Sequence, residues 1–257
     1  LVIYDNMKQS LMFYSTEDGR FVKSEKFNKP TPAEIAYWGG YFFYHNRLHR
    51  NYQDDISLHY YLLASKDGIT IGKRYFKHEN NKEDYPFSPS GHNLYDNNSK
   101  LYYCRDFDNI VYQIHEDSVV PRFRINLPNP LPASMIEERP NEMSLLRSGY
   151  SLGITDIYEY GGLLFFRFVK DGYIWSCLYN VEESKQVYCA KRIKFLDSSL
   201  IDTIDGIYKD CFYSILTPEY LDYAFSENPL EDYPDLFKTY DVEGDNPVIA
   251  FYRAVVR

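Results

Sequence analysis

Polar side chains recur at one position of a pattern that repeats along this 257-residue chain. Each repeat contains a short apolar strand, and four residues after its start the chain carries Asp5, His45, Arg105, Arg167 and, in the fifth repeat, Ile215. If the repeats surround one axis, the four polar side chains would ring one mouth of a central channel. Arg with His suits an anionic group such as a carboxylate, because a guanidinium donates two parallel hydrogen bonds to it. The alternative is that each strand simply ends in solvent, where charged residues are ordinary.

The histidines form no recognisable metal-binding or catalytic motif. His45, His49 and His59 fall within one repeat, but a zinc site needs each ligand within about 2.0–2.1 Å of one point. The first two are expected on a loop and the third in a different strand. Ser90 and His92 are close in sequence, yet a catalytic triad is defined by spatial roles, and a loop turn explains this tripeptide. We therefore expect neither a metal ion nor a cofactor.

Carboxylates are abundant, and they define the catalytic alternative. Glycoside hydrolysis needs two of them roughly 5–9.5 Å apart across a cleft. Most of these residues lie in expected turns, where Asp and Glu are common for conformational reasons. The acidic clusters are Asp54-Asp55, Asp106 with Asp108, Glu137-Glu138 and Glu182-Glu183. A carbohydrate-active hydrolase or lyase would use Asp or Glu at the channel mouth and would hold two carboxylates with opposed pKa shifts.

Composition and charge exclude several classes of partner. The net charge is −9 and the isoelectric point is about 5.2, whereas binding a phosphate backbone requires clustered Lys and Arg. No run of 18 apolar residues is present, so no segment is predicted to span a membrane. Aromatic residues make up 18% of the chain, with 27 Tyr and 17 Phe, which favours strands. We expect a protein or glycan partner and no nucleic acid.

Aromatic residues in or near expected loops are candidates for that contact. They are Tyr37, Trp38, Tyr52, Tyr85, Tyr150 and Tyr158. Aromatic rings stack on sugar rings and also pack against protein partners. Packing between repeats is the alternative explanation for all six.

Five repeats predict an all-β fold. Their apolar strands are Leu1–Tyr4, Tyr41–Tyr44, Leu101–Cys104, Leu163–Phe166 and Cys211–Ser214. Four of these strands follow a turn signal rich in Gly, Asn or Asp, residues that tolerate the positive φ of tight hairpins. The strands begin about 40 to 62 residues apart, which matches four-stranded antiparallel propeller blades with insertions. We predict a single β-propeller domain over residues 1–257, with about five blade units.

The first four repeats continue with a second hairpin. Its turns are expected at Glu17–Gly19, Lys66–Gly68, Glu116–Ser118 and Glu182–Ser184. The fifth repeat departs from this pattern. Thr217 and Pro218 are typical of the N-cap and first position of a helix, a second helix is expected over Asp232–Tyr240, and a last strand over Val248–Tyr252. Short helices are also expected at Met135–Glu138 and Glu142–Leu146.

The four cysteines match neither a disulfide scaffold nor a zinc motif. Cys177 and Cys189 flank the turn at Glu182–Ser184 almost symmetrically, which would place them on facing strands. A cross-strand disulfide and a pair of buried free thiols both fit this spacing.

Several motifs together resemble a bacterial group of six-bladed β-propellers that are NHL-like in shape. They are Tyr4-Asp5, Asp18–Phe21, Trp38–Phe42 and Asp245–Tyr252. The resemblance implies a secreted or lipid-anchored protein of the cell envelope, or periplasm, whose biochemical role is generally unassigned. About five units are present here rather than six, and Leu1 reads as mid-strand. We therefore expect an N-terminal portion upstream of Leu1, and self-association through exposed strand edges if the ring is open.

Two functions follow from these observations. The first is a non-catalytic binding or scaffold propeller that recognises a protein or a glycan. The second is the carbohydrate-active hydrolase or lyase described above. Turnover of a bound glycan distinguishes them, because only the enzyme would consume its ligand.

Overall fold

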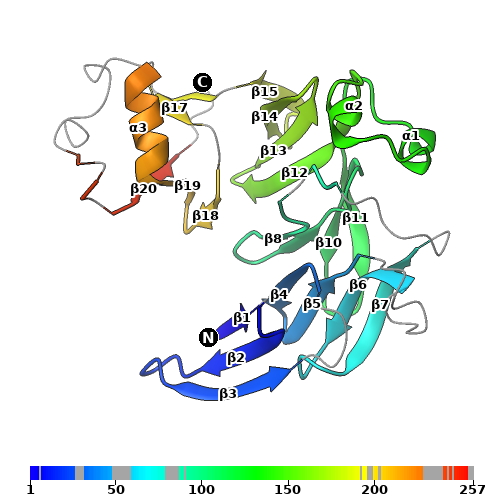
Figure 1. Cartoon of the computed structure of the whole chain (residues 1–257), viewed down its shortest axis with the longest axis vertical. Helices are drawn as coiled ribbons and strands as arrows, with labels where there is room; N and C mark the ends of the chain where they lie inside the picture. Colours follow the sequence, from blue (N-terminus) through cyan, green and yellow to red (C-terminus); the bar gives the residue numbers. More distant parts are fainter. Residues whose placement is uncertain are drawn as a thin grey trace.

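The chain folds into antiparallel sheets that follow one another along an arc (Figure 1). The computed structural model describes residues 1–5, 7–26, 32–47, 59–78, 87–89, 91–191, 193–195, 199–201, 204–227, 240–241, 243–244 and 246–253. Five of the sheets are arranged as propeller blades, so the predicted all-β fold with about five blade units is confirmed. The expected second helix at Asp232–Tyr240 lies almost entirely outside the described residues.

Each blade is a meander of neighbouring antiparallel strands. The first blade contains β1 (Val2–Asp5), β2 (Ser10–Tyr14) and β3 (Phe21–Lys26). The second contains β4 (Glu34–Trp38), β5 (Tyr41–His45), β6 (Tyr60–Ser65) and β7 (Ile71–Lys77). The third contains β8 (Leu94–Asp96), β9 (Leu101–Tyr103), β10 (Ile110–Ile114) and β11 (Val119–Arg124). The fourth contains β12 (Ser151–Tyr160), β13 (Leu163–Lys170), β14 (Tyr173–Asn180) and β15 (Lys185–Ala190).

The end of the chain is less regular. The fifth blade contains β18 (Gly206–Tyr208), β19 (Cys211–Leu216) and β20 (Val248–Tyr252), and β16 (Ile193–Phe195) pairs with β17 (Ser199–Ile201) before it. The helices are α1 (Ala133–Glu137), α2 (Glu142–Leu146) and α3 (Pro218–Glu227). In the first and fifth blades, three strands lie within the described residues. β1 corresponds to the second strand of the other blades, because β2 and β3 follow it in the sheet just as β6 and β7 follow β5.

Local sequence explains the hairpins. In the second blade, Gly39 and Gly40 have φ values of +57° and +80° and join Trp38 to its partner Tyr41. Both angles lie in the left-handed region that glycine reaches without steric cost, as a two-residue turn between twisted strands requires. At the start of α3, the Thr217 hydroxyl oxygen accepts a hydrogen bond from the backbone N–H of Tyr220 at 3.3 Å, which is the predicted cap.

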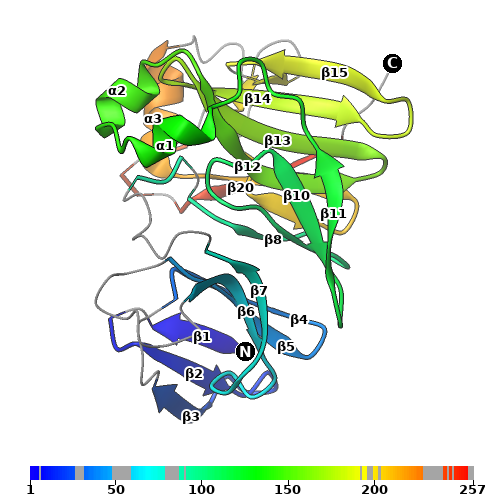
Figure 2. The same ribbon diagram turned by 90° about the vertical axis from the view of Figure 1, so that its right-hand side faces the viewer.

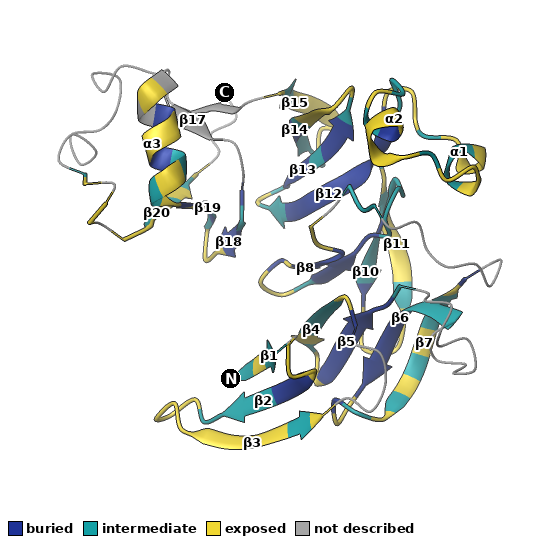
Figure 3. Ribbon diagram, viewed as in Figure 1, coloured by how far each residue is buried: buried dark blue, intermediate teal, exposed yellow. Residues whose placement is uncertain are grey.

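The core lies between blades rather than within one sheet. Phe42 and Tyr44 of the second blade pack with Leu11 of the first. Tyr41 and Phe43, which point to the opposite face of β5, pack with the third blade. Figure 3 shows that the second strands of blades, such as β5 and β13, are buried, whereas the outer strand β3 is mostly exposed. Each central blade therefore buries both of its faces, and its stability depends on both neighbours.

The first strands of the blades form the inner side of the arc. β4 lies beside β8, β8 beside β12, and β12 beside β18. In Figure 1 the first and fifth blades stand at the two ends of the arc. Figure 2, which views the arc from its edge, shows α1, α2 and α3 on the same side of it. No helix in the described part of the chain is long and apolar enough to cross a bilayer.

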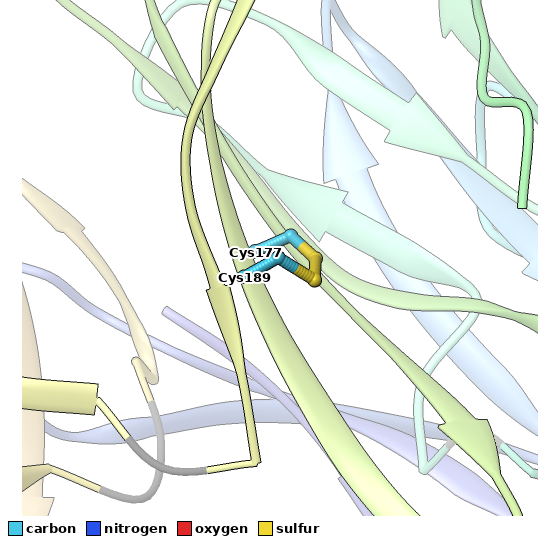
Figure 4. The surroundings of a disulfide bond; sticks show 2 residues. All are labelled: Cys177 and Cys189. Atoms are coloured by element: carbon cyan, nitrogen blue, oxygen red, sulfur yellow. A yellow bond between two sulfur atoms is a disulfide. The ribbon is translucent and has the colours of Figure 1, made fainter. Parts of the chain in front are cut away.

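A disulfide joins the two outer strands of the fourth blade. Cys177 of β14 lies directly opposite Cys189 of β15, and their sulfur atoms are bonded (Figure 4). The sequence left this pair open between a disulfide and free thiols, and the structure resolves it as a disulfide. Cys104 is a buried free thiol, and Cys211 is a partly buried one.

Reducing this disulfide is expected to lower the free energy of unfolding by about 2 kcal/mol, because the crosslink restricts the unfolded chain. The measurement is urea unfolding of the protein with and without a thiol reductant. The Cys177→Ala, Cys189→Ala double variant is the control, since reductant should leave its midpoint unchanged. Equal midpoints for the oxidised and reduced wild type would contradict the expectation.

Candidate functional site

A cavity of about 390 Å³ opens on the inner side of the arc, where the third, fourth and fifth blades meet. We call it the axial pocket. Its lining residues are His92, Leu94, Tyr95, Asp96, Asn98, Tyr158, Asp205, Gly206, Ile207 and Tyr213. They come from β8 and the residues flanking it, from β12, and from the β18–β19 hairpin. The pocket therefore exists only because three blades lie side by side.

Two phenols in the pocket bridge neighbouring blades. The Tyr95 hydroxyl lies 3.2 Å from the Thr155 hydroxyl of β12, and the Tyr158 hydroxyl donates to the carbonyl oxygen of Asp205 at 3.0 Å. The two rings meet edge to face with centroids 6.2 Å apart. Burial, with the nearby charges of Asp156 and Asp205, raises the pKa of Tyr158, so this phenol stays protonated. These contacts fix the aromatic wall of the pocket.

The third phenol depends on a glycine. Gly206 is the cross-strand partner of Tyr213, and a Cβ built on Gly206 would lie 2.7 Å from the Tyr213 ring and hydroxyl. The phenol thus occupies the space that any other residue at position 206 would fill, a pairing in which an aromatic side chain covers a strand glycine. A side chain at position 206 would displace the phenol from the pocket wall.

Two carboxylates line the pocket. Asp96 is the last residue of β8, and partial burial raises the pKa of its carboxyl group. Asp205 precedes β18, and its Oδ2 accepts the backbone N–H of Ile215 at 2.6 Å. With the three phenols and Asn98, they give a surface that both accepts hydrogen bonds and presents aromatic carbon.

A carboxylate–imidazole pair lies at the margin of the pocket. Glu34 begins β4, and its Oε1 is 3.2 Å from Nδ1 of His92. Its Oε2 accepts the backbone N–H groups of Asn93 and Leu94 at 2.5 and 3.0 Å. The hydrogen bond to Glu34 raises the pKa of His92. The Glu34 side chain of the second blade therefore fixes the residues at the start of β8, the first strand of the third blade.

Within the described residues, no three His, Cys, Asp or Glu side chains come close enough together to hold a metal ion. His49, one of the histidines considered from the sequence, lies outside those residues, and His45 and His59 belong to different segments of the second blade. The candidate site is therefore described by its hydrogen bonds, rings and charges.

Each of the four residues of the predicted channel-mouth ring contacts another group of the protein. Asp5 Oδ1 accepts the backbone N–H of Lys8 at 2.9 Å, and the buried His45 has Nδ1 3.1 Å from the Tyr103 hydroxyl. Two ion pairs follow: Arg105 with Asp108 at 2.7 Å, and Arg167 with Asp156 at 2.7 Å. Of the described residues that line the axial pocket, none belongs to this set. A ligand for the ring stays a prediction.

The ring position lies on the second strand of a blade or, for Arg105, just after it, whereas the first strand lines the inside of the arc. Register connects the two, because Glu34 pairs with His45, and Thr155 with Arg167. The sequence contained a signal for this. A two-residue turn at Gly39-Gly40 pairs residues whose numbers sum to 79, which places Glu34 opposite His45. The same register count across each turn would locate the first-strand residues that lie opposite the ring position, which reasoning from single strands misses.

The aromatic candidates have mixed outcomes. Tyr158 is buried on β12 and lines the pocket, and Trp38 packs in the core between the second and third blades. Tyr37 is 60% exposed, and Tyr150 packs partly against a small cluster around α2. Tyr52 and Tyr85 lie outside the described residues.

A protein-family model described as "Domain of unknown function (DUF4934)" matches residues 1–253. The chain belongs to the DUF4934 family. Among solved structures, a protein of Bacteroides fragilis NCTC 9343, provisionally described as exported, is similar with a TM-score of 0.74. The two sequences are 15% identical, and the match covers 97% of this chain and 72% of the other. No curated protein matches the sequence.

These comparisons establish the family and the fold of the DUF4934 chain. At 15% identity, the similarity to the B. fragilis protein extends to the propeller architecture. The family description assigns no activity. Function has to be inferred from the axial pocket.

Proposed function

We propose that this chain is a non-catalytic binding propeller of the bacterial cell envelope whose axial pocket takes a glycan. One observation carries the proposal: three phenols and two carboxylates line a single cavity where three blades meet. Sugars present both C–H faces and rows of hydroxyl groups. Aromatic rings pack on the C–H faces, and carboxylate, amide and phenol oxygens accept hydrogen bonds from the hydroxyl groups. A cavity of about 390 Å³ falls within the size range of small-molecule sites.

The location rests on two supporting facts. The similar B. fragilis protein is provisionally described as exported. The disulfide between Cys177 and Cys189 is typical of an oxidising compartment outside the cytosol. A periplasmic, secreted or lipid-anchored protein accounts for both.

The complete propeller is proposed to be six-bladed and NHL-like. Within the part of the chain that the structure describes, Ile215, Ile249 and Phe251 of the fifth blade are 46%, 55% and 53% exposed. Ile215 pairs with Ile249, so these residues lie together on one face of the sheet. The first blade likewise exposes Ile3 and Phe21. Central blades bury both faces, so a sixth blade between these two ends would remove both apolar surfaces from water. Copies lacking that blade would associate through these faces, which size-exclusion chromatography with light scattering measures.

The alternative is a carbohydrate-active hydrolase or lyase. It is favoured by the presence of two carboxylates, Asp96 and Asp205, in one pocket. The pKa of Asp96 is raised by partial burial, as a general acid requires. Under this alternative Asp96 would donate a proton to the leaving group.

Glycan-array binding followed by a turnover assay tests the proposal. The array is probed with the wild-type protein, and each hit is then incubated with it and analysed for cleavage products. Binding without turnover supports the proposal, and turnover replaces it with the hydrolase or lyase. An array without hits would overturn the glycan proposal and favour a protein partner.

Gly206→Ala is expected to weaken binding of an array hit at least ~10-fold, because the new methyl group displaces the Tyr213 phenol from the pocket. Gly72→Ala is the matched control. It also places a methyl group in a strand, but its nearest neighbour would be the Ala64 carbonyl oxygen at 3.8 Å, an ordinary contact. Titration calorimetry on both variants measures the difference. Unchanged affinity in Gly206→Ala would place the glycan outside the axial pocket.

A further inference from the structure

The residues that line the axial pocket carry net negative charge. Asp96 and Asp205 are its acidic residues, and no Lys or Arg is among the described residues that line it. Among the described lining residues, His92 is the one whose side chain can carry a positive charge, and its Nδ1 lies 3.2 Å from Oε1 of Glu34. The Glu34 carboxylate would therefore balance the positive charge of a protonated His92. The two aspartates would then be the dominant charges that face a ligand.

Arg167 of the neighbouring strand β13 does not reverse this charge. Nε of Arg167 lies 2.7 Å from Oδ2 of Asp156, and both side chains are largely buried. The charges of Asp156 and Arg167 act on Tyr158 in opposite directions. An ion pair at this distance is close to neutral as seen from the pocket. The Arg167–Asp156 pair therefore leaves the net negative charge of the lining residues unchanged.

We propose that the glycan taken by the axial pocket carries a protonated amino group, as an amino sugar does. This inference rests on the proposed function and specifies its ligand class. An ammonium group would be attracted by the two aspartates and would donate to their oxygens in charge-assisted hydrogen bonds. Phenol rings attract cations as well, through the negative face of the π-system. Three of the ten lining residues are tyrosines.

The aspartates also favour this ligand over an acidic one. Asp96 is an exposed residue at the end of β8, and partial burial raises the pKa of its carboxyl group, so its negative charge loses some of its solvation. A bound cation would stabilise that charge, whereas a uronic acid or a sialic acid would bring a third carboxylate against the two. A neutral sugar would gain hydrogen bonds without the charge attraction. The order of affinity follows: amino sugar, neutral sugar, acidic sugar.

Three disaccharides of the same linkage and ring type test the preference for an amino sugar over a neutral one. They are the β-1,4-linked dimers of glucosamine, N-acetylglucosamine and glucose, which differ only in the group at C2: ammonium, acetamide or hydroxyl. Calorimetric titration at about pH 6.5, where an amine of this kind is protonated and carboxylates are ionised, gives each affinity. The glucosamine dimer is expected to bind at least ~10-fold more tightly than the other two.

Charge-removing variants locate the preference. Asp96→Asn and Asp205→Asn each keep a hydrogen-bond acceptor and should each reduce the preference for the glucosamine dimer several-fold. Asp117→Asn is the control, since that carboxylate is 88% exposed and pairs with Lys73, and it should leave the preference unchanged.

The outcomes separate the two proposals. Equal or tighter binding of the neutral dimers overturns the amino-sugar inference and leaves the glycan proposal standing. Preference for an oligolysine peptide over all three dimers, or binding by none of them together with an empty glycan array, overturns both.

Discussion

Gly153→Ala is expected to lower the free energy of unfolding by about 3 kcal/mol. Gly153 has a φ of +92°, and a Cβ there would lie 2.7–3.0 Å from the backbone atoms of Phe107 in the third blade. Alanine would combine an unfavourable backbone conformation with a clash against atoms that cannot rotate away, and each effect costs about 1–3 kcal/mol. Urea unfolding followed by tryptophan fluorescence measures the loss.

The reason for this sensitivity is a blade-to-blade contact. β12 interrupts its pairing with β13 between Ser151 and Ile154, and the freed N–H of Ile154 donates to the carbonyl oxygen of Asp108 at 3.1 Å. Gly153 lets the loop of the third blade approach closely enough to accept that bond. Gly19→Ala is the control: its φ is +70°, but its Cβ would meet nothing within 4 Å. It should cost about 1 kcal/mol, and an equal loss in both variants would show that the Phe107 contact has no energetic role.

Glu159→Ala is expected to destabilise the protein by about 2–3 kcal/mol. The Glu159 side chain is 9% exposed, and it accepts from Lys100 at 2.9 Å, from Arg122 at 3.1 Å and from the Tyr102 hydroxyl. All three donors belong to the third blade, whereas Glu159 belongs to the fourth. Alanine would leave these groups without their acceptor between the blades, but the Lys100 and Arg122 side chains are 36% and 40% exposed, so water replaces part of what they lose. Chemical unfolding measures the loss.

Glu159→Gln separates charge from shape, and pH supplies a second readout. Burial raises the pKa of Glu159, but hydrogen bonds from Tyr102, Lys100 and Arg122 outweigh it, and the pKa lies below the ordinary 4.5. Since the folded-state pKa is below the unfolded value, the stabilisation is fully present above about pH 4.5 and is lost as the pH falls through the folded-state value. The difference in unfolding free energy between wild type and Glu159→Gln should shrink over that range. A difference independent of pH would show that the carboxylate charge is not what the three donors recognise.

Sequence reasoning succeeded where the determinants are local. The Asp-Gly hairpins, the paired glycines before the second strands and the Thr217-Pro218 helix start each contain their own signal within a few residues, and the structure has these elements at the expected places. The facing positions of Cys177 and Cys189 likewise follow from symmetry about one turn. The five blade units were predictable because the same local pattern recurs.

The site was harder to predict, because its residues are brought together across blades. Tyr158 looked like a loop residue in the sequence but is a buried residue of a ten-residue strand. Glu34 reaches residues 58 to 60 positions away, and Glu159 reaches others 37 to 59 positions away. Contacts at these sequence separations have no signal in the local sequence. Gly153 is also invisible from sequence, since only the approach of Phe107 requires it.

Energetic coupling between blades has a consequence for how the protein unfolds. Glu34 links the second blade to the third, Glu159 links the third to the fourth, and Tyr158 links the fourth to the fifth. Such an array behaves as a one-dimensional chain of units, in which each unit is stabilised by its nearest neighbours alone. The first and fifth blades have one such neighbour among the five, so opening should begin there and spread inwards. Amide hydrogen exchange would then form a gradient, fastest in β1–β3 and β18–β20 and slowest in β8–β13.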